Sequence, residues 1–584
     1  MSMFSPWLAL PCALWLANAE PLVAQGPVTK TYDLRGLLAP EFPWRAGVRM
    51  MPGEDPGETP RTGARSEVPT GALGQEDVLA ILAQAVGPAE NGAAAPLLQV
   101  TNDLLVVTAT EEAHQRIATW VELCRQIYLE QVTFEVHLLP ATTLSGASGR
   151  LQRDEADRLL RAAGPHPTYT STTRVGSSTL LRSDQDSCFV RDYDVEVAQK
   201  SVSFDPKLDV LLTGRAWQIT TSRCVDGRLL VSVVGQYAEE AEPPRLLQLP
   251  HRDLRAKQQT TPVHLPILRY HQENAVARLA DGEALLFGGD DSHGSACCVR
   301  MRRPQTVAAP SGGGWAWLAT GDCAGPRQPA ACAHLCLKAP GDDRPLLAQA
   351  PAEAPSPLLL DAAALLEVVS SGPLSQDAGD FVGPLPGGWL LVRADETRCK
   401  AALDLLRGMT SSLVRDLTVE VRYGRLATPD ATLAGDGRLD PAELSAKLPG
   451  TYLASALLTD NFHRLAFVQH AYVRDYEVEI AQEAAVPNPV IGSANAGITI
   501  AGRVMPAARD QFRLFLEVSF TELVGKIVTF DLEDEDLGPV ELVTMRDVTF
   551  EVSPIVEARR WALMYLAPLH GTDEHFAVVA RVRE

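Results

Sequence analysis

The apolar positions of this chain follow a helical period in two stretches near the N-terminus and a period of two over most of the remaining residues. Over residues 75–86 and 111–128 the apolar side chains fall on one face at helical spacing. Residues 29–34 are extended, and residues 97–108 predict two strands joined by a turn at Asn102-Asp103. Thr110 is the expected N-cap of the second helix. Together these elements predict a small α/β module.

From Val132 onward, apolar residues alternate with polar ones, which is typical of strands with one buried face. A short helix is expected at about residues 152–163. The pattern then predicts strands near 177–181, 189–199, 210–220, 228–237, 264–270 and 284–287. The turns between them are polar or contain glycine, as at Asp281-Gly282. The sum is a mostly antiparallel β-domain with one helix.

The same order of elements returns later in the chain at a nearly constant distance. Residues 189–199 and 472–482 are identical at eight of eleven positions, and the second segment begins 283 residues after the first. Three further matches are 285 residues apart: Leu104–Val107 with Trp389–Val392, Thr133–Val136 with Thr418–Val421, and Arg228–Val231 with Arg513–Leu516. A shared distance over so much of the chain predicts duplication of a whole folding unit.

We therefore predict an α+β fold in which a small α/β module and a mostly antiparallel β-domain occur twice in tandem. A chain of 584 residues has room for roughly three to five domains. The second copy is expected to have a helix at 359–368, a strand at 389–392 and a helix at 396–407. The predicted boundaries are 1–19 for a signal peptide, 26–130 and 131–300 for the first copy, 301–357 for a Pro/Gly/Cys-rich linker, and 358–414 and 415–584 for the second copy.

The N-terminus has the pattern of an export signal. A short apolar core at residues 7–16 is followed by the small residues Ala17-Asn18-Ala19, although no Lys or Arg precedes the core. The alternative is a buried or disordered N-terminal segment. No later apolar stretch reaches the roughly 18 residues that a membrane-spanning helix needs. Export would favour local disulfides over a zinc site among the clustered cysteines Cys297, Cys298, Cys323, Cys332 and Cys336.

Composition narrows the possible partners. The apolar fraction of 46% is ordinary for a folded protein. Asp and Glu number 73 against 52 Lys and Arg, which gives a formal net charge of −21. Such a surface repels phosphate backbones, so a nucleic-acid partner is not expected.

Two repeated triplets are the candidate site residues. Arg191-Asp192-Tyr193 returns as Arg474-Asp475-Tyr476. Within a strand the Arg and Tyr side chains share one face and the Asp takes the other. A structural ion pair, or a contact between the strand edges of two subunits, accounts for this pattern without catalysis.

Residues 432–443 resemble a calcium-binding loop only in part. Loop positions 5, 6, 9 and 12 are occupied by Asp436, Gly437, Asp440 and Glu443. Positions 1 and 3 are Thr432 and Ala434, so two of the expected oxygen ligands are missing. A helix start, with Asp440 as N-cap and Pro441 as the first helical residue, fits better. No metalloprotease, nucleophile-elbow, phosphate-loop or dinucleotide motif occurs in the sequence. We therefore expect no enzyme activity, cofactor or metal.

The order of these elements resembles the bacterial secretin superfamily, the outer-membrane ring proteins of type II and type III secretion and type IV pili. Leu104–Ile117 is similar to the strand, turn and helix of a secretin N-domain, and Arg278–Gly289 to the family's Asp-Gly turn, apolar strand and paired glycines. Residues 557–565 of the second copy have no glycine pair. Gly289 runs directly into Asp290-Asp291, where a typical secretin continues into membrane-facing hairpins.

The resemblance implies two secretin-like β-domains in a divergent, duplicated relative. It implies a cell-envelope protein, exported to the periplasm or outer membrane of a diderm bacterium, that is a structural or transport subunit of a ring. Its partners would be copies of itself or other envelope proteins, and membrane insertion stays open. The alternative is an exported, non-pore scaffold or binding protein that kept the fold without the membrane hairpins. An enzyme of unrecognised type is the third possibility.

Overall fold

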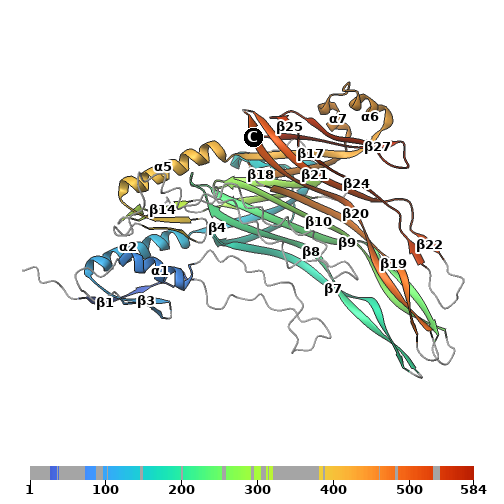
Figure 1. Cartoon of the computed structure of the whole chain (residues 1–584), viewed down its shortest axis with the longest axis horizontal. Coiled ribbons are helices and arrows are strands. Elements are labelled where there is room, and N and C mark those ends of the chain that lie inside the picture. The colour runs from blue at the N-terminus through green and yellow to red at the C-terminus, as the bar shows by residue number, and fades with distance from the viewer. Residues whose placement is uncertain are drawn as a thin grey trace, which may run out of the picture.

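The computed structural model consists of two small α/β modules at one end and two large antiparallel β-sheets that run away from them (Figure 1). The mostly antiparallel β architecture with a few helices agrees with the predicted fold class. The predicted signal peptide lies outside the described residues. The structure describes residues 27–35, 37–38, 73–86, 97–101, 103–144, 149–198, 201–252, 258–290, 295–303, 311–312, 315–319, 381–385, 389–458, 461–480, 485–508, 510–530 and 540–584.

The first α/β module has a three-stranded sheet of order β1-β3-β2 covered by two helices. Its elements are β1 (Val28–Asp33), α1 (Gln75–Val86), β2 (Leu97–Thr101), β3 (Leu104–Ala109) and α2 (Glu111–Tyr128). The Thr110 side chain accepts a hydrogen bond from the backbone N–H of Ala113 at 3.3 Å, which confirms the predicted N-cap. Both predicted helices have the expected bounds because their caps and apolar faces are local features of the sequence.

The second module contains a strand that the sequence pattern did not predict. Trp315–Ala319 forms β14 inside the segment expected to be a linker, and Trp317 and Leu318 are buried. Because the surrounding residues are rich in Pro, Gly and Ala, so short a strand gives no recognisable alternating pattern. The predicted helix at 359–368 lies outside the described residues. The sheet order is β13-β14-β16-β15, formed by β13 (Ser311–Gly312), β14, β15 (Phe381–Leu385) and β16 (Trp389–Arg393), followed by α5 (Glu396–Leu413).

The two modules share one core. Trp317 and Trp389 of the second sheet belong to the same buried cluster as Trp120 of α2 and Leu82 of α1. The helices of the first module therefore lie between its own sheet and that of the second module, as Figure 1 shows.

The long sheet has the order β7-β8-β9-β10-β19-β20-β21-β24, with every pair antiparallel. The strands predicted at 177–181 and 189–199 are parts of one 21-residue strand. The bounds are β7 (Ser178–Ala198), β8 (Ser201–Arg223), β9 (Leu229–Arg252), β10 (Gln258–Leu279), β19 (Asn461–Ile480), β20 (Ala485–Ala508), β21 (Gln511–Leu523) and β24 (Met545–Val552). β25 (Ile555–Glu557) also pairs with β21, and a separate hairpin of β22 (Val528–Phe530) and β23 (Val540–Leu542) comes between β21 and β24.

The second sheet faces the long one and has the order β6-β4-β12-β11-β18-β17-β27-β26. The short strand β5 (Arg150–Leu151) adds to β11. The bounds are β4 (Gln131–Pro140), β6 (Thr168–Arg174), β11 (Ala284–Asp290), β12 (Ser295–Arg302), β17 (Asp416–Ala427), β18 (Gly450–Leu457), β26 (Ala562–Pro568) and β27 (Glu574–Arg583).

Short helices follow the first strand of each half of this sheet. They are the 3₁₀ turn η2 (Ala141–Leu144), α3 (Arg153–Ala162), α6 (Thr428–Gly435) and α7 (Pro441–Lys447). The Asp440 carboxylate accepts a hydrogen bond from the backbone N–H of Ala442 at 2.8 Å, which confirms the helix start predicted there in place of a calcium loop.

The hydrophobic core lies between the two sheets. In the first half Phe134 of β4 and Phe287 of β11 pack with Trp217 of β8. In the second half Val419 of β17 and Phe576 of β27 pack with Leu514 of β21. Burial of these large side chains, at about 25 cal/mol per Å² of apolar surface, holds the sheets together.

Cys297 and Cys298 lie in β12 as buried free thiols. Burial raises the pKa of both, that of Cys298 to about 12. The expected local disulfides therefore do not involve these two residues. Cys323, Cys332 and Cys336 lie outside the described residues.

No helix in the described part of the chain is long and apolar enough to cross a bilayer. Among the same residues, His, Cys, Asp and Glu side chains form no group of three or more that could hold a metal ion.

Candidate assembly interface

A seam runs through both large sheets between the residues of the first and second halves. In the long sheet β10 pairs with β19, from Ile267 opposite His470 to Glu273 opposite Arg464. In the second sheet β11 pairs with β18, where Gly289 lies opposite Tyr452. Each seam is an antiparallel strand pair, so the two halves form continuous sheets.

The strand order is the same on both sides of the seam. The long sheet has β7-β8-β9-β10 on one side and β19-β20-β21-β24 on the other. The second sheet has β6-β4-β12-β11 and then β18-β17-β27-β26. The two halves thus meet through β10 and β19 in the long sheet and through β11 and β18 in the second sheet.

Side-chain positions match as well as strand order. Glu135 of β4 lies opposite Arg300 of β12, and Glu420 of β17 lies opposite Arg581 of β27. Two residues away, Thr133 is opposite Arg302 and Thr418 is opposite Arg583. The same cross-strand pairs therefore stand at the same register in both halves.

The seam holds a fully buried arginine, Arg464, and Gly289 of the first half makes room for it. A Cβ at Gly289 would overlap the guanidinium of Arg464. That guanidinium donates to the Tyr423 hydroxyl at 3.0 Å and lies 3.5 Å from the Glu273 carboxylate. The second of the paired glycines noted in the sequence thus has a packing role at the junction.

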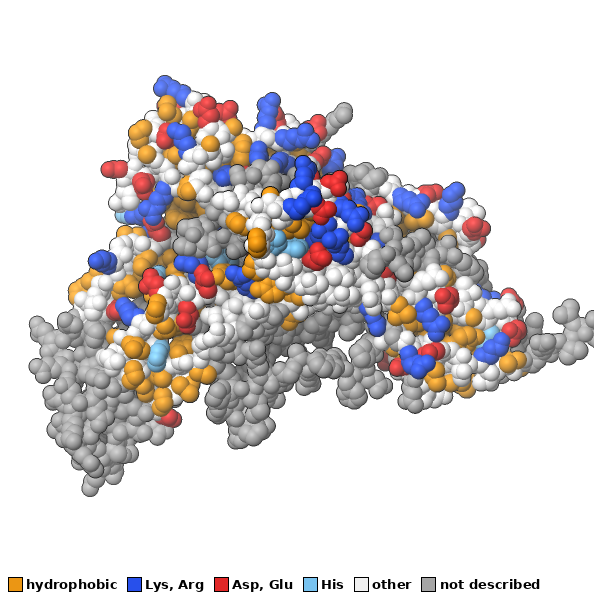
Figure 2. All heavy atoms as spheres, turned by 180° about the vertical axis from the view of Figure 1, so that it is seen from behind, with side chains coloured by type: hydrophobic (Ala, Val, Ile, Leu, Met, Phe, Trp, Pro, Cys, Tyr) orange, Lys and Arg blue, Asp and Glu red, His pale blue; other side chains and the backbone are white. Residues whose placement is uncertain are grey.

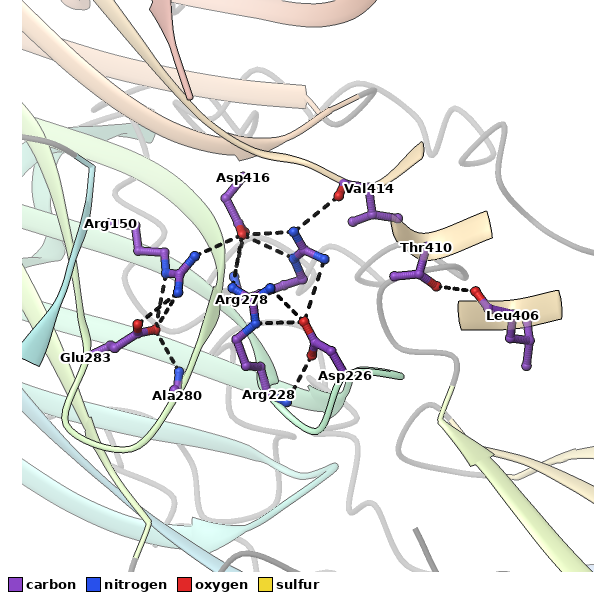
Figure 3. A network of polar contacts seen from close by, with 10 residues as sticks. All are labelled: Arg150, Asp226, Arg228, Arg278, Ala280, Glu283, Leu406, Thr410, Val414 and Asp416. Atoms are coloured by element: carbon purple, nitrogen blue, oxygen red, sulfur yellow. Dashed lines mark hydrogen bonds and ion pairs between the residues drawn. The ribbon is translucent and has the colours of Figure 1, made fainter. Parts of the chain in front are cut away.

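A network of charges fixes the junction at the start of β17 (Figure 3). Asp416 of the second half lies among three arginines of the first half, Arg150, Arg228 and Arg278. Its carboxylate accepts from Arg278 Nη2 at 3.0 Å and from the Arg278 backbone N–H at 2.9 Å. Arg150 Nη1 approaches at 3.3 Å.

Residues of the first half hold these arginines in place. Glu283 accepts from Arg150 Nη2 at 2.8 Å and also from the backbone N–H of Ala280 at 2.8 Å. Asp226 accepts from Arg228 Nε at 2.7 Å. Because most of these side chains are largely withdrawn from solvent, the network stabilises one relative placement of the two halves.

The network could not be found in the sequence because its members are far apart along the chain. Arg278 and Glu283 lie in the segment with the Asp-Gly turn, but their role did not emerge there. The available signal was the pair of charges flanking a turn between two apolar strands. Nothing local connects them to Asp416.

The outer edges of both sheets carry strands with one neighbour each among the described strands. They are β7 and β24 in the long sheet and β6 and β26 in the second sheet. An edge strand presents unpaired backbone donors and acceptors, which are a template for pairing with another chain.

The predicted site residues lie on β7 and β19. Arg191 is the extra residue of a β-bulge in the β7–β8 ladder, and Arg474 is the extra residue of a bulge in the β19–β20 ladder. Tyr193 is buried within the chain, where its hydroxyl donates to the carbonyl of Pro262 at 3.1 Å. The side chains of Arg191, Asp192, Arg474, Asp475 and Tyr476 lie outside the described ones. Their role in subunit contacts stays a prediction.

Charges on the face shown in Figure 2 are mixed. Lys and Arg side chains lie beside Asp and Glu in small groups, with the densest group near the middle of the view. The densest group of charges on the described part of this face therefore contains both signs.

A pair of histidines lies at the outer edge strand β6. His137 Nδ1 of β4 is 3.0 Å from His166 Nε2, and His137 Nε2 is 3.7 Å from the Glu135 carboxylate. Burial lowers the pKa of His137, and the neighbouring His166 lowers it further. Burial also lowers the pKa of His463 and His470 at the seam.

We expect the free energy of unfolding to fall as the pH is lowered from 7.5 to 5.5. A histidine whose pKa is depressed in the folded state contributes stability above its ordinary pKa of 6.5, and this contribution is lost as the pH falls below that value. Urea unfolding at pH 7.5, 6.5 and 5.5 measures it. His137→Gln should reduce the slope, and a free energy independent of pH over this range would contradict the prediction.

No family model matches the sequence, and no curated protein matches it. Among solved structures, the chain is similar to the InvG secretin domain of the Salmonella SPI-1 injectisome at 12% identity and a TM-score of 0.19, over 38% of this chain and 79% of that one. The type IV competence pilus secretin PilQ of V. cholerae gives 10% identity and a TM-score of 0.16, over 38% and 72%. ExeD of Aeromonas hydrophila gives 9% and 0.18, over 96% and 90%. At this identity and TM-score the likenesses carry no functional argument.

Proposed function

We propose that this chain is a secretin-like cell-envelope protein, a structural or transport subunit of a ring in the outer membrane or periplasm, and not an enzyme. The observation that carries the proposal is the seam. Two sets of strands in the same order meet there edge to edge. The outer edges of the sheets carry the strands that are equivalent in position to those that meet at the seam. We propose further that the two halves arose by duplication.

The seam supplies a template for contact between chains. β24 holds in the second half the place of β10 in the first, and β7 holds the place of β19. β24 of one copy can therefore pair with β7 of the next, as β10 pairs with β19. In the second sheet β26 holds the place of β11 and β6 holds the place of β18, so β26 of one copy can pair with β6 of the next. Such a head-to-tail contact closes into a ring if its rotation allows.

A ring of this kind contains two four-stranded units of each sheet per chain. The sequence resemblance of Leu104–Ile117 and Arg278–Gly289 to secretins favours the envelope as its location. Its partners would be copies of itself and other envelope proteins. The exported scaffold is the alternative, and a monomer in the soluble periplasmic fraction would favour it.

Engineered disulfides test the edge pairing. Leu180 of β7 is equivalent to His463 of β19, because each lies ten residues before the residue that precedes the bulge, Val190 or Val473. Across the seam, the backbone N–H of His463 donates to the Asn274 side chain of β10. Leu180→Cys is combined in turn with Cys at the solvent-facing β24 positions Asp547, Thr549 and Glu551. All variants carry Cys188→Ser, since Cys188 is exposed on β7.

We expect oxidation to give disulfide-linked chains for one of these pairs, because antiparallel partners place Cβ atoms about 4.5–5.5 Å apart. Leu180→Cys with Cys at the exposed Glu112 of α2 is the matched control and should stay unlinked. Native mass spectrometry of the unchanged chain gives the copy number. A monomer that forms no specific cross-link at any of the three positions would overturn the proposal.

A further inference from the structure

Exposed apolar side chains occur at two places beside the long sheet, on the separate hairpin β22–β23 and on β8. On hairpin β22–β23, Val528 is 50%, Phe530 51% and Leu542 51% exposed. On β8, next to the outer edge strand β7, Leu208 is 57% exposed. Large apolar side chains gathered on one exposed face are typical of an interaction surface.

The hairpin is held so that its apolar face is exposed beside the described strands. Val528 lies opposite Leu542 and Phe530 opposite Val540, so these residues share one face. Glu541 is on the other face, where it is buried in an ion pair with Arg245 of β9. β23 also contacts β19. The apolar face is therefore oriented by a fixed ion pair and is left uncovered within the described residues.

The chain contains an internal example of how such a face is covered. Val263 and Leu265 of β10 form a buried cluster with Tyr193 of β7, and Leu247 of β9 packs on it. Ile491 of β20 packs against the same cluster. A residue of the second half thus covers the outer parts of β9 and β10 in the first half.

Leu208 holds in the first half the place that Ile491 holds in the second. Leu208 lies opposite Val190, directly before the bulge at Arg191. Ile491 lies opposite Val473, directly before the bulge at Arg474. The two apolar residues are therefore at equivalent positions, one covered against a neighbouring half and the other exposed.

Hairpin β22–β23 likewise holds the place of the outer parts of β9 and β10. The hairpin lies between β21 and β24 in the chain. In the first half, the outer parts of β9 and β10 lie in the same way between the parts of these two strands that belong to the long sheet. The hairpin contacts β19 of its own half, as β10 contacts β7. The exposed face of the hairpin and Leu208 therefore correspond to the two sides of the internal contact, and both are exposed.

We propose that Leu208 of one copy of this chain docks on the face of Val528, Phe530 and Leu542 of a second copy. The inference rests on the proposed edge-to-edge association and names a contact within it. Burial of Leu208 against this face adds an apolar contact beyond the paired strands. Because the two surfaces differ, the contact is head to tail: each copy binds one neighbour through Leu208 and another through the hairpin.

Sedimentation velocity on the full chain tests the contact. We expect Leu208→Asp to weaken association at least about tenfold, because it removes the burial of a leucine and places a charge on an apolar face. Leu246→Asp is the matched control: Leu246 is 54% exposed on β9, next in sequence to Leu247 and pointing to the opposite face. It should associate like the unchanged chain.

Phe530→Asp, on the other side of the contact, should cause a similar loss. Mixing Leu208→Asp chains with Phe530→Lys chains should restore part of the association. Because these positions are exposed, thermal unfolding of each variant should match that of the unchanged chain. Unchanged association of both Leu208→Asp and Phe530→Asp would overturn the contact alone, and a chain that never associates would overturn the proposed function as well.

Discussion

Replacing Glu420 by glutamine is expected to lower the free energy of unfolding by about 3 to 5 kcal/mol, because it removes a fully buried charge that three partly buried arginines share. The Glu420 side chain is 0% exposed. It accepts from Arg581 Nη2 at 2.6 Å and Arg583 Nη2 at 3.0 Å, and Arg422 Nη2 lies 3.2 Å away. Urea unfolding followed by circular dichroism at pH 7.5 measures the change.

Glu135→Gln is the matched control. Glu135 holds the same register position in the first half, but its side chain is 26% exposed and its ion pair with Arg302 is longer, at 3.5 Å. We expect its loss to cost about 1 kcal/mol or less, as for partly solvated pairs. Equal losses at Glu420 and Glu135 would show that burial does not set the strength of these clusters.

Replacing Asp416 by asparagine is expected to destabilise the junction by about 3 kcal/mol, because its carboxylate neutralises arginines that are largely buried. Arg278 and Arg150 of the first half would each lose a charged partner at 3.0 and 3.3 Å. Hydrogen exchange gives a second measurement. Amides of the seam strands β11 and β18 should exchange faster, while those in the middle of each half stay protected.

Glu584→Gln supplies the control for this second change. Glu584 forms an ion pair with Arg415, which directly precedes Asp416, and both side chains are well exposed. An exposed pair contributes about 0 to 1 kcal/mol, so this variant should unfold almost like the unchanged chain. If Asp416→Asn had no larger effect than Glu584→Gln, the network would not be what joins the halves.

The helices were predictable because the signals that set them are local. Thr110 caps α2 and Asp440 caps α7 through backbone N–H groups two or three residues away. The two segments predicted from residues 177–199 illustrate the opposite case. Polar residues such as Asp184 and Asp186 break the alternating pattern there, yet the ladder with β8 continues through them. A strand's length depends on the partner that completes its hydrogen bonds.

Local patterns were enough to predict the helices and strands, the repeated segments and the residues of the Asp-Gly turn. The sequence also placed the two Arg-Asp-Tyr triplets at matching points of their strands. Tertiary packing, by contrast, set the pairing of β10 with β19, the grouping of Arg150 and Arg278 around Asp416, and the exposure of Leu208 where Ile491 is covered. The physical reason is distance along the chain, since a periodic pattern reports which face of a strand is apolar but not which distant strand will lie against its edge.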